Sequence, residues 1–351
     1  MKPELLRILG MINGALVAAL VLIAGSETYL RLTIPASSGE SIYRYTLETR
    51  RYKVMKPNVS VSAWGKELRT NELGFRDNAP AIPPKQPDEF RIIVLGSSFT
   101  VSAGVDFADI YTSRLEQQLR QIDPKVKVIN LAVGGYNPLQ YELVLKEVGL
   151  GLDPDMVLVA LFPDSDFRLD IYEENRRVAE GKAAEARPSA WDENLYTYRA
   201  YGRRIADKVK SVLDRPAAPS SDFQARRAWL ENTAALERIA QTARERKLPL
   251  AVAMLPHTFN FTRQREMFGR IQRFCREQQL PCLNLLESFI ARQVPEGQLR
   301  LNVLDSHPNE KYNAIVAHVL SSELGPVLPA LKDRDSNWAS APTVRRAEFQ
   351  R

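Results

Sequence analysis

Short apolar runs alternate with longer amphipathic stretches through the middle of this chain, and this alternation restricts its fold more than any other feature. Each run is almost continuously apolar, which is typical of strands buried on both faces of a parallel sheet. The expected strands are 91–95, 126–133, 156–162, 248–255 and 282–286. The expected helices are 110–122, 139–148, 229–243, 267–275 and 311–324. The pattern predicts an α/β fold in which helices cover both faces of a parallel sheet.

The carboxyl ends of the predicted strands hold the polar residues of greatest interest. Ligands of such sheets bind just outside these ends. Four segments fall there: Gly96–Ser98, Gly134–Asn137, Pro163–Asp166 and Pro256-His257. We therefore expect the functional site at this edge, with His257 in contact with substrate.

Ser98 follows the first predicted strand, and Asp305 and His307 precede the last predicted helix. A serine, a histidine and an aspartate are the parts of a nucleophilic triad, in which the imidazole takes the serine proton and the carboxylate orients the imidazole. Ser98 and His307 lie 209 residues apart, so only the fold can join them. Each also has a structural interpretation, because a serine after a strand is more often a helix N-cap and a histidine before a helix can belong to its first turn.

The N-terminus carries an apolar stretch, residues 8–25, with Lys2 and Arg7 in front of it. Its length is at the short end for a membrane span and long for the core of a signal peptide. The basic residues predict that the N-terminus stays in the cytoplasm and that the rest of the chain is exported. Since the helical pattern continues beyond the stretch, residues 1–32 are expected to be an uncleaved membrane anchor. Cleavage at Ala24-Gly25-Ser26 and a buried soluble helix are the alternatives.

Changes in composition divide the rest of the chain into four parts. Residues 33–90 are rich in turns and alternating segments, which predicts a β-rich lead-in. Residues 91–326 form the main domain, with a polar insertion at about 168–221. The insertion is either a set of solvated helices or a wall over the site, where its tyrosines and arginines would suit sugars or anionic polymers. Residues 327–351 are expected to be a disordered tail.

The two cysteines, Cys275 and Cys282, lie at the end of a predicted helix and the start of a predicted strand. Export into an oxidising compartment would allow a disulfide between them. The alternative is a pair of buried thiols.

Charge and motif content exclude several classes of function. The 48 basic and 42 acidic residues of the 351-residue chain give a net charge of +6, and the two signs are interspersed. This is typical of a solvated surface rather than of a nucleic-acid-binding stripe. Gly96 begins no glycine-rich phosphate loop, and no histidine or cysteine spacing is typical of zinc. We therefore expect no cofactor, no metal and no nucleic-acid partner.

The order of these segments, from Arg91 to Leu324, resembles the SGNH (GDSL-type) hydrolases, a family of esterases, lipases and carbohydrate O-acetyl-processing enzymes with a flavodoxin-like three-layer α/β fold. The approach segment 68–76 (LRTNELGFR) resembles that of membrane-anchored members linked with cell-envelope polysaccharides. The blocks that carry the resemblance are Gly96-Ser97-Ser98-Phe99-Thr100, Asn130–Tyr136, Asp164–Phe167 and Asp305-Ser306-His307-Pro308.

The resemblance implies a role for each motif residue. Ser98 would be the nucleophile, His307 the general base and Asp305 the group that orients it. The oxyanion hole would be formed by Ser98, Gly135 and Ser165.

Two positions depart from the family pattern. Ser97 stands where the first block has an aspartate that supports the loop. Ser165 stands where the oxyanion-hole asparagine is usual, and the loss of one such donor can lower the rate on the order of 10²–10³-fold.

The implied function is that of a serine-dependent ester hydrolase (an acyl or acetyl esterase) acting on a cell-envelope carbohydrate or lipid ester. Its catalytic domain would be extracytoplasmic, held at a bacterial inner membrane and facing the periplasm, with polysaccharide-assembly proteins as partners. One alternative is an O-acyltransferase with the same triad, because only the acceptor of the acyl group differs. Another is a non-catalytic polysaccharide-binding scaffold with a degenerate SGNH pocket.

Overall fold

The computed structural model describes residues 3–35, 41–182, 195–198 and 221–332. Its centre is a five-stranded parallel sheet in the order β6-β5-β7-β8-β9, which is the flavodoxin-like order. The strands are β5 (Phe90–Gly96), β6 (Val126–Asn130), β7 (Met156–Leu161), β8 (Leu250–Met254) and β9 (Cys282–Asn284). Every residue of β5, β7 and β8 is buried, because both faces of the sheet are covered. The predicted α/β fold with a parallel sheet is therefore confirmed.

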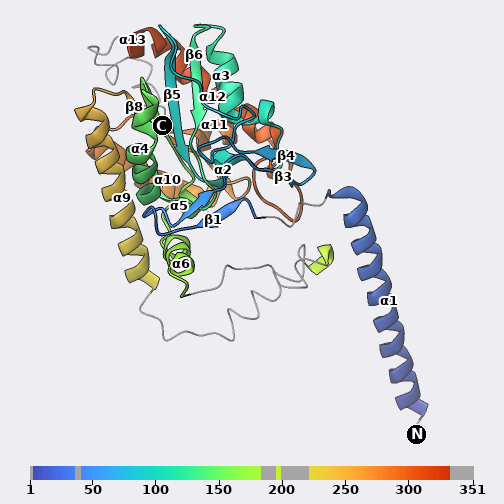
Figure 1. Cartoon of the computed structure of the whole chain (residues 1–351). Helices are drawn as coiled ribbons and strands as arrows, with labels where there is room; N and C mark the ends of the chain where they lie inside the picture. Colours follow the sequence, from blue (N-terminus) through green and yellow to red (C-terminus); the bar gives the residue numbers. More distant parts are fainter. Residues whose placement is uncertain (1–2, 36–40, 183–194, 199–220, 333–351) are drawn as a thin grey trace.

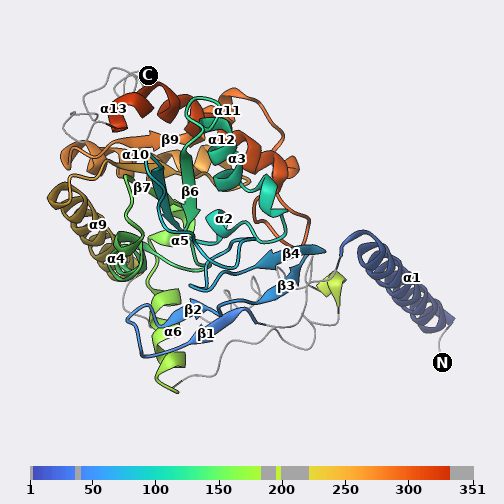
Figure 2. The ribbon, with the colours of Figure 1, turned by 45° about the horizontal axis from the view of Figure 1, so that its top comes forward.

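Helices cover the sheet on two sides, as Figures 1 and 2 show. Helix α3 (Tyr111–Leu119) packs against α12 (Glu310–Leu324) on one side. Helix α4 (Pro138–Glu147) packs against α9 (Ser221–Glu245) on the other. Helix α10 (Phe261–Glu277) connects β8 to β9.

Two antiparallel hairpins make up the regular structure of the lead-in. Strand β1 (Tyr43–Tyr45) pairs with β2 (Lys53–Met55), and β3 (Ser60–Ala63) pairs with β4 (Lys66–Arg69). In Figure 2 both hairpins lie beside the end of the sheet that carries the short helices α2 (Ser98–Val101) and α5 (Pro163–Asp166). The lead-in therefore lies along the edge where the functional site is expected.

The insertion is described only in part. Helix α6 (Asp170–Ala179) follows α5 and contacts β1 and β2, so this part lies against the lead-in. Residues 183–194 and 199–220, on which the choice between solvated helices and a wall over the site also depends, lie outside the described residues.

Among the predicted boundaries that differ from the structure, three have a clear local physical reason. The strand expected to reach residue 133 ends at Asn130, whose side chain accepts the N–H of Ala132 and turns the chain. The strand expected to reach residue 286 ends at Asn284, whose side chain caps helix α11 (Leu285–Ala291). The tail expected to be disordered from residue 327 begins with helix α13 (Leu328–Lys332), in which Leu328 is buried in the core. The remainder, 333–351, lies outside the described residues.

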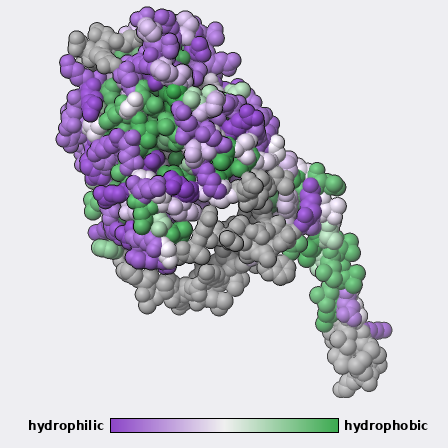
Figure 3. All heavy atoms as spheres, in the orientation of Figure 1, coloured by the Kyte–Doolittle hydropathy of each residue, from purple (hydrophilic) through white to green (hydrophobic). Residues whose placement is uncertain are grey.

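Helix α1 (Pro3–Thr33) extends away from the α/β domain in Figure 1. Within it, Gly10–Thr33 has a mean hydropathy of 1.6 and is long enough to cross a membrane. Its apolar side chains are exposed, as the green surface along the helix in Figure 3 shows. An exposed apolar helix at this position is typical of a membrane anchor or of a signal sequence.

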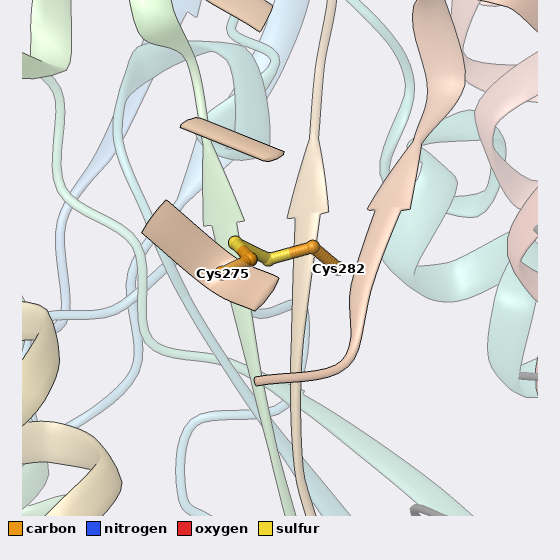
Figure 4. Close-up of a disulfide and its surroundings, with 2 residues drawn as sticks. All are labelled: Cys275 and Cys282. Carbon is orange, nitrogen blue, oxygen red and sulfur yellow. A yellow bond between two sulfur atoms is a disulfide. The ribbon is translucent and has the colours of Figure 1, made fainter. Parts of the chain in front are cut away.

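A disulfide joins Cys275 of α10 to Cys282 of β9 (Figure 4). Of the two interpretations of the cysteines, the structure shows the bonded pair. The bond links the end of the connecting helix to the edge strand that follows it.

Candidate active site

Ser98 is the first residue of α2, directly after the buried strand β5. The N-cap of this helix is Ser97, so Ser98 does not have the capping role that its position in the sequence also allowed. The turn is tight, because a Cβ on Gly96 would come within 2.3 Å of the Thr100 hydroxyl oxygen. Only glycine fits there without a shift of its neighbour.

A buried arginine from the lead-in holds the other end of α2. The Arg76 guanidinium donates hydrogen bonds of 2.6 Å to the carbonyl groups of Val101 and Ser102. Burial lowers the pKa of Arg76 to about 10. The helix that carries Ser98 is thus tied to the lead-in at its C-terminal end.

The structure brings Ser98, His307 and Asp305 into one hydrogen-bonded chain. His307 Nε2 lies 2.9 Å from Ser98 Oγ, and His307 Nδ1 lies 2.6 Å from Asp305 Oδ1. A carboxylate can only accept, so Nδ1 carries the proton and Nε2 is free to accept the one from Ser98. The His307 side chain is 40% exposed, so the histidine at the centre of this hydrogen-bonded chain is accessible to solvent.

Asp305 is held in its ionised form. Burial alone would raise the pKa of Asp305, but the hydrogen bonds and charge of His307 outweigh it and lower the pKa below its usual value. The backbone N–H of His307 also donates to Oδ1, at 2.9 Å.

Buried contacts explain why residues so far apart in sequence meet. Asn309 caps α12, because its side chain accepts a hydrogen bond from the N–H of Tyr312. The helix therefore begins just after His307. Asn313, one turn further on, accepts from the Ser102 hydroxyl and from the N–H of Tyr111. The start of α12 is therefore fastened to the end of α2.

The loop after β6 brings Gly134 close to Ser98, and Gly135 follows it in the chain. A Cβ on Gly134 would lie 3.7 Å from Ser98 Cβ and 2.3 Å from the Tyr43 hydroxyl oxygen. Gly135 has a φ of +78°, which favours glycine. The backbone N–H groups of Gly135 and Ser98 donate no hydrogen bond to another described residue.

The Ser165 side chain does not have the arrangement expected of an oxyanion donor. Its hydroxyl donates to Asp166 Oδ1 at 3.0 Å, and a hydroxyl has only one proton to give. Asp166 is fully buried and also accepts from the Tyr141 hydroxyl at 2.6 Å and the N–H of Phe162 at 2.7 Å. Burial raises the pKa of Asp166 to about 7 although these donors oppose the shift.

His257 lies at the carboxyl end of β8, close to the triad. Its ring centre is 5.7 Å from that of Phe99, which is also 5.7 Å from that of His307. Burial lowers the pKa of His257; the charge of Asp164 opposes this shift and that of His307 adds to it. The predicted site-edge histidine thus lies close to His307, and its side chain is only 12% exposed.

Three residues near the site were missed from the sequence, and all belong to the lead-in: Trp64, Tyr43 and Arg76. The Trp64 indole N–H donates to Asp305 Oδ2 at 2.7 Å. A signal for Trp64 existed, because a large aromatic followed by Gly65 between two alternating segments marks an unusual turn. Within the described ranges, no group of three or more histidine, cysteine or acidic side chains could hold a metal ion.

Comparisons with known proteins return similarity only to solved structures; no family model and no curated protein matches the chain. An acetylxylan esterase from Geobacillus stearothermophilus aligns at 14% identity and a TM-score of 0.41, over 69% of this chain and 97% of its own. The psychrotrophic esterase EstA from Pseudoalteromonas sp. aligns at 13% and 0.42, over 69% and 100%. A two-domain esterase active on acetylated mannans aligns at 15% and 0.38, over 70% and 50%.

Proposed function

We propose that this protein is a serine-dependent ester hydrolase that removes acyl or acetyl groups from a cell-envelope carbohydrate or lipid. The observation that carries the proposal is the hydrogen-bonded chain Ser98–His307–Asp305 at the carboxyl edge of the sheet, with distances of 2.9 and 2.6 Å. Such a chain is the working arrangement of a nucleophilic triad. The substrate class rests on the resemblance of segment 68–76 to membrane-anchored family members.

The reaction proceeds in two halves. In the first, Ser98 Oγ attacks the ester carbonyl carbon while His307 Nε2 takes its proton; the carbon–oxygen bond to the alcohol then breaks as the alcohol receives that proton. In the second, His307 takes a proton from water as its oxygen attacks the acyl carbon; the bond from that carbon to Ser98 Oγ then breaks as His307 returns the proton to Oγ, releasing the acid. Asp305 remains ionised and stabilises the imidazolium in both halves.

The charge on the carbonyl oxygen needs donors that are already aimed at it. The backbone N–H groups of Ser98 and Gly135, which donate to no other described residue, are two of them. In place of Ser165, the third donor is the Tyr43 hydroxyl, which lies against Gly134 beside Ser98. Burial raises the pKa of Tyr43 to about 12, so that the phenol keeps its proton at neutral pH.

The proposed location is the outer side of a bacterial inner membrane, with α1 as the anchor, the catalytic domain in the periplasm, and polysaccharide-assembly proteins as neighbours. The apolar helix Gly10–Thr33 and the Cys275–Cys282 disulfide support this location, because disulfides persist in oxidising compartments. Recovery of a mature chain that begins near Glu27 would contradict the uncleaved anchor.

A fluorophosphonate probe tests the proposal directly, since it labels only an activated serine. The wild-type protein should be labelled and should hydrolyse a p-nitrophenyl acetate reporter. Ser98→Ala should lose both properties. Ser60→Ala, which removes an exposed hydroxyl on β3, is the matched control and should retain them. A wild-type protein that is neither labelled nor active would favour the binding scaffold instead. Transfer of acetyl to an added sugar, faster than to water, would indicate the acyltransferase.

A further inference from the structure

We propose that Trp64 is a positioning residue for Asp305, and that through it the lead-in hairpin and the end of the anchor helix maintain the triad. This inference rests on the proposed function. It assigns part of the catalytic arrangement to a segment that lies before the α/β domain in sequence.

Trp64 completes the hydrogen bonding of the carboxylate. Oδ1 of Asp305 accepts from the ring and the backbone of His307, whereas Oδ2 accepts from the Trp64 indole N–H at 2.7 Å. The Asp305 side chain is 19% exposed, so without the indole Oδ2 would be open to water. With both oxygens engaged, the carboxylate cannot rotate about its terminal bond, and the imidazole it orients is fixed as well.

The backbone at Trp64 is unusual in a way that fits this role. Trp64 and Gly65 form the turn between β3 and β4 with φ values of 52° and 77°. Two successive positive φ values define a turn that favours Asn-Gly, and a bulky side chain in this region is an outlier. Unfavourable backbone of this kind is retained where a side chain has to be presented in one direction, and here that direction is toward Asp305.

The Trp64 side chain also packs against residues at the end of α1. It lies with Leu304 against a small apolar cluster that includes Leu30 and Ile34, at and just after the end of α1. A Cβ on Gly65 would come within 2.8 Å of Pro35, so the hairpin turn and the chain leaving α1 are in close contact. The seating of the anchor on the domain therefore bears on the same side chain that holds Asp305.

The first test removes only the indole N–H from the full-length protein in detergent. Trp64→Phe keeps an aromatic ring, and Trp64→β-(3-benzothienyl)alanine replaces N–H by sulfur with almost no change of shape. We expect either change to lower kcat for the acetate reporter by about tenfold with little change in KM. The acidic limb of the pH profile should move to higher pH, because the carboxylate that lost a donor holds the proton on the imidazole more tightly. Trp229→Phe is the control, because Trp229 packs on Phe167 and Arg270 instead of on Asp305. It should change neither kcat nor the pH profile.

A second test removes the Trp64 N–H in the Asp305→Asn variant, where we expect its removal to have the opposite effect on activity. In Asp305→Asn the Trp64 N–H holds the amide oxygen, which leaves the NH₂ group facing His307 and supports the wrong imidazole tautomer. Removing that N–H should therefore raise the activity of Asp305→Asn severalfold, although it lowers that of the wild type. A role limited to packing would lower both.

The outcomes separate the two proposals. Absence of fluorophosphonate labelling in the wild type overturns the proposed function itself. A labelled wild type in which the sulfur analogue retains full kcat and an unmoved pH profile overturns the role of Trp64 alone. Equal losses in the wild-type and Asp305→Asn backgrounds also overturn it.

Discussion

Replacing Asp166 with asparagine tests how the buried carboxyl behind the candidate site affects folding stability. Asp166 is fully buried and accepts from Tyr141, Phe162 and Ser165. Burial raises the pKa of Asp166 to about 7, from 3.8 for an unperturbed aspartate. The folded protein therefore holds a proton that the unfolded chain has already released at intermediate pH.

This difference in pKa between the folded and unfolded states determines how the stability changes with pH. Below about pH 4 both states are protonated and the stabilisation from this group is fully present; it is lost as the pH rises through about 7. One pKa unit corresponds to about 1.4 kcal/mol, so the free energy of unfolding should fall by about 2–3 kcal/mol from this group between about pH 5 and pH 8. For a domain of this size the loss corresponds to a decrease in Tm of about 5–10 °C.

Asparagine can occupy the site with its hydrogen bonds made. Its oxygen can accept from Tyr141 and Phe162, while its NH₂ group donates to the Ser165 hydroxyl oxygen. Because the amide does not titrate, the contribution of this position should no longer change with pH. The proton of Ser165, released from Asp166, would then be free to turn toward the site.

The assay is thermal unfolding of the wild type and of Asp166→Asn at several pH values from about 5 to 8. We expect the Tm of the variant, relative to the wild type, to increase with pH by about 5–10 °C. Asp170→Asn, at a side chain that is 58% exposed, is the control and should follow the wild type. A constant difference between Asp166→Asn and the wild type would refute the reasoning, since it would mean that the carboxyl does not change its protonation state in this pH range.

Three further predictions concern the site and the fold. Asp305→Asn should lower kcat/KM for the acetate reporter on the order of 10³–10⁴-fold, because an amide supports the wrong imidazole tautomer; a loss below tenfold would contradict the triad. Tyr43→Phe should lower kcat on the order of 10²-fold with intact fluorophosphonate labelling, if the phenol donates to the oxyanion; unchanged kcat would remove it from that role. Replacing Cys275 and Cys282 with serine should lower the free energy of unfolding by about 2–3 kcal/mol, measured by urea denaturation; an unchanged midpoint would indicate that the bond does not form.

Much of the central sheet could be predicted because its strands are buried on both faces and are therefore apolar almost throughout. The boundaries that were missed depend on single polar side chains. Asn130 and Asn284 end their strands because their side chains accept a nearby backbone N–H. An asparagine in the middle of a strand would look the same in the apolar pattern, so the pattern does not locate these ends.

The sequence by itself determined the order of strands and helices, the exposed apolar helix at the N-terminus, and the identity of Ser98, Asp305 and His307 as partners. These features follow from periodicity and from residue type, which are local properties. Only the tertiary structure decided which other side chains face them. The hydroxyl of Ser165 donates to the buried Asp166, and Trp64 and Tyr43 reach the site from hairpins that precede the domain in sequence. The physical reason is that a hydrogen bond depends on positions to within a few tenths of an ångström, and packing between distant segments sets those positions.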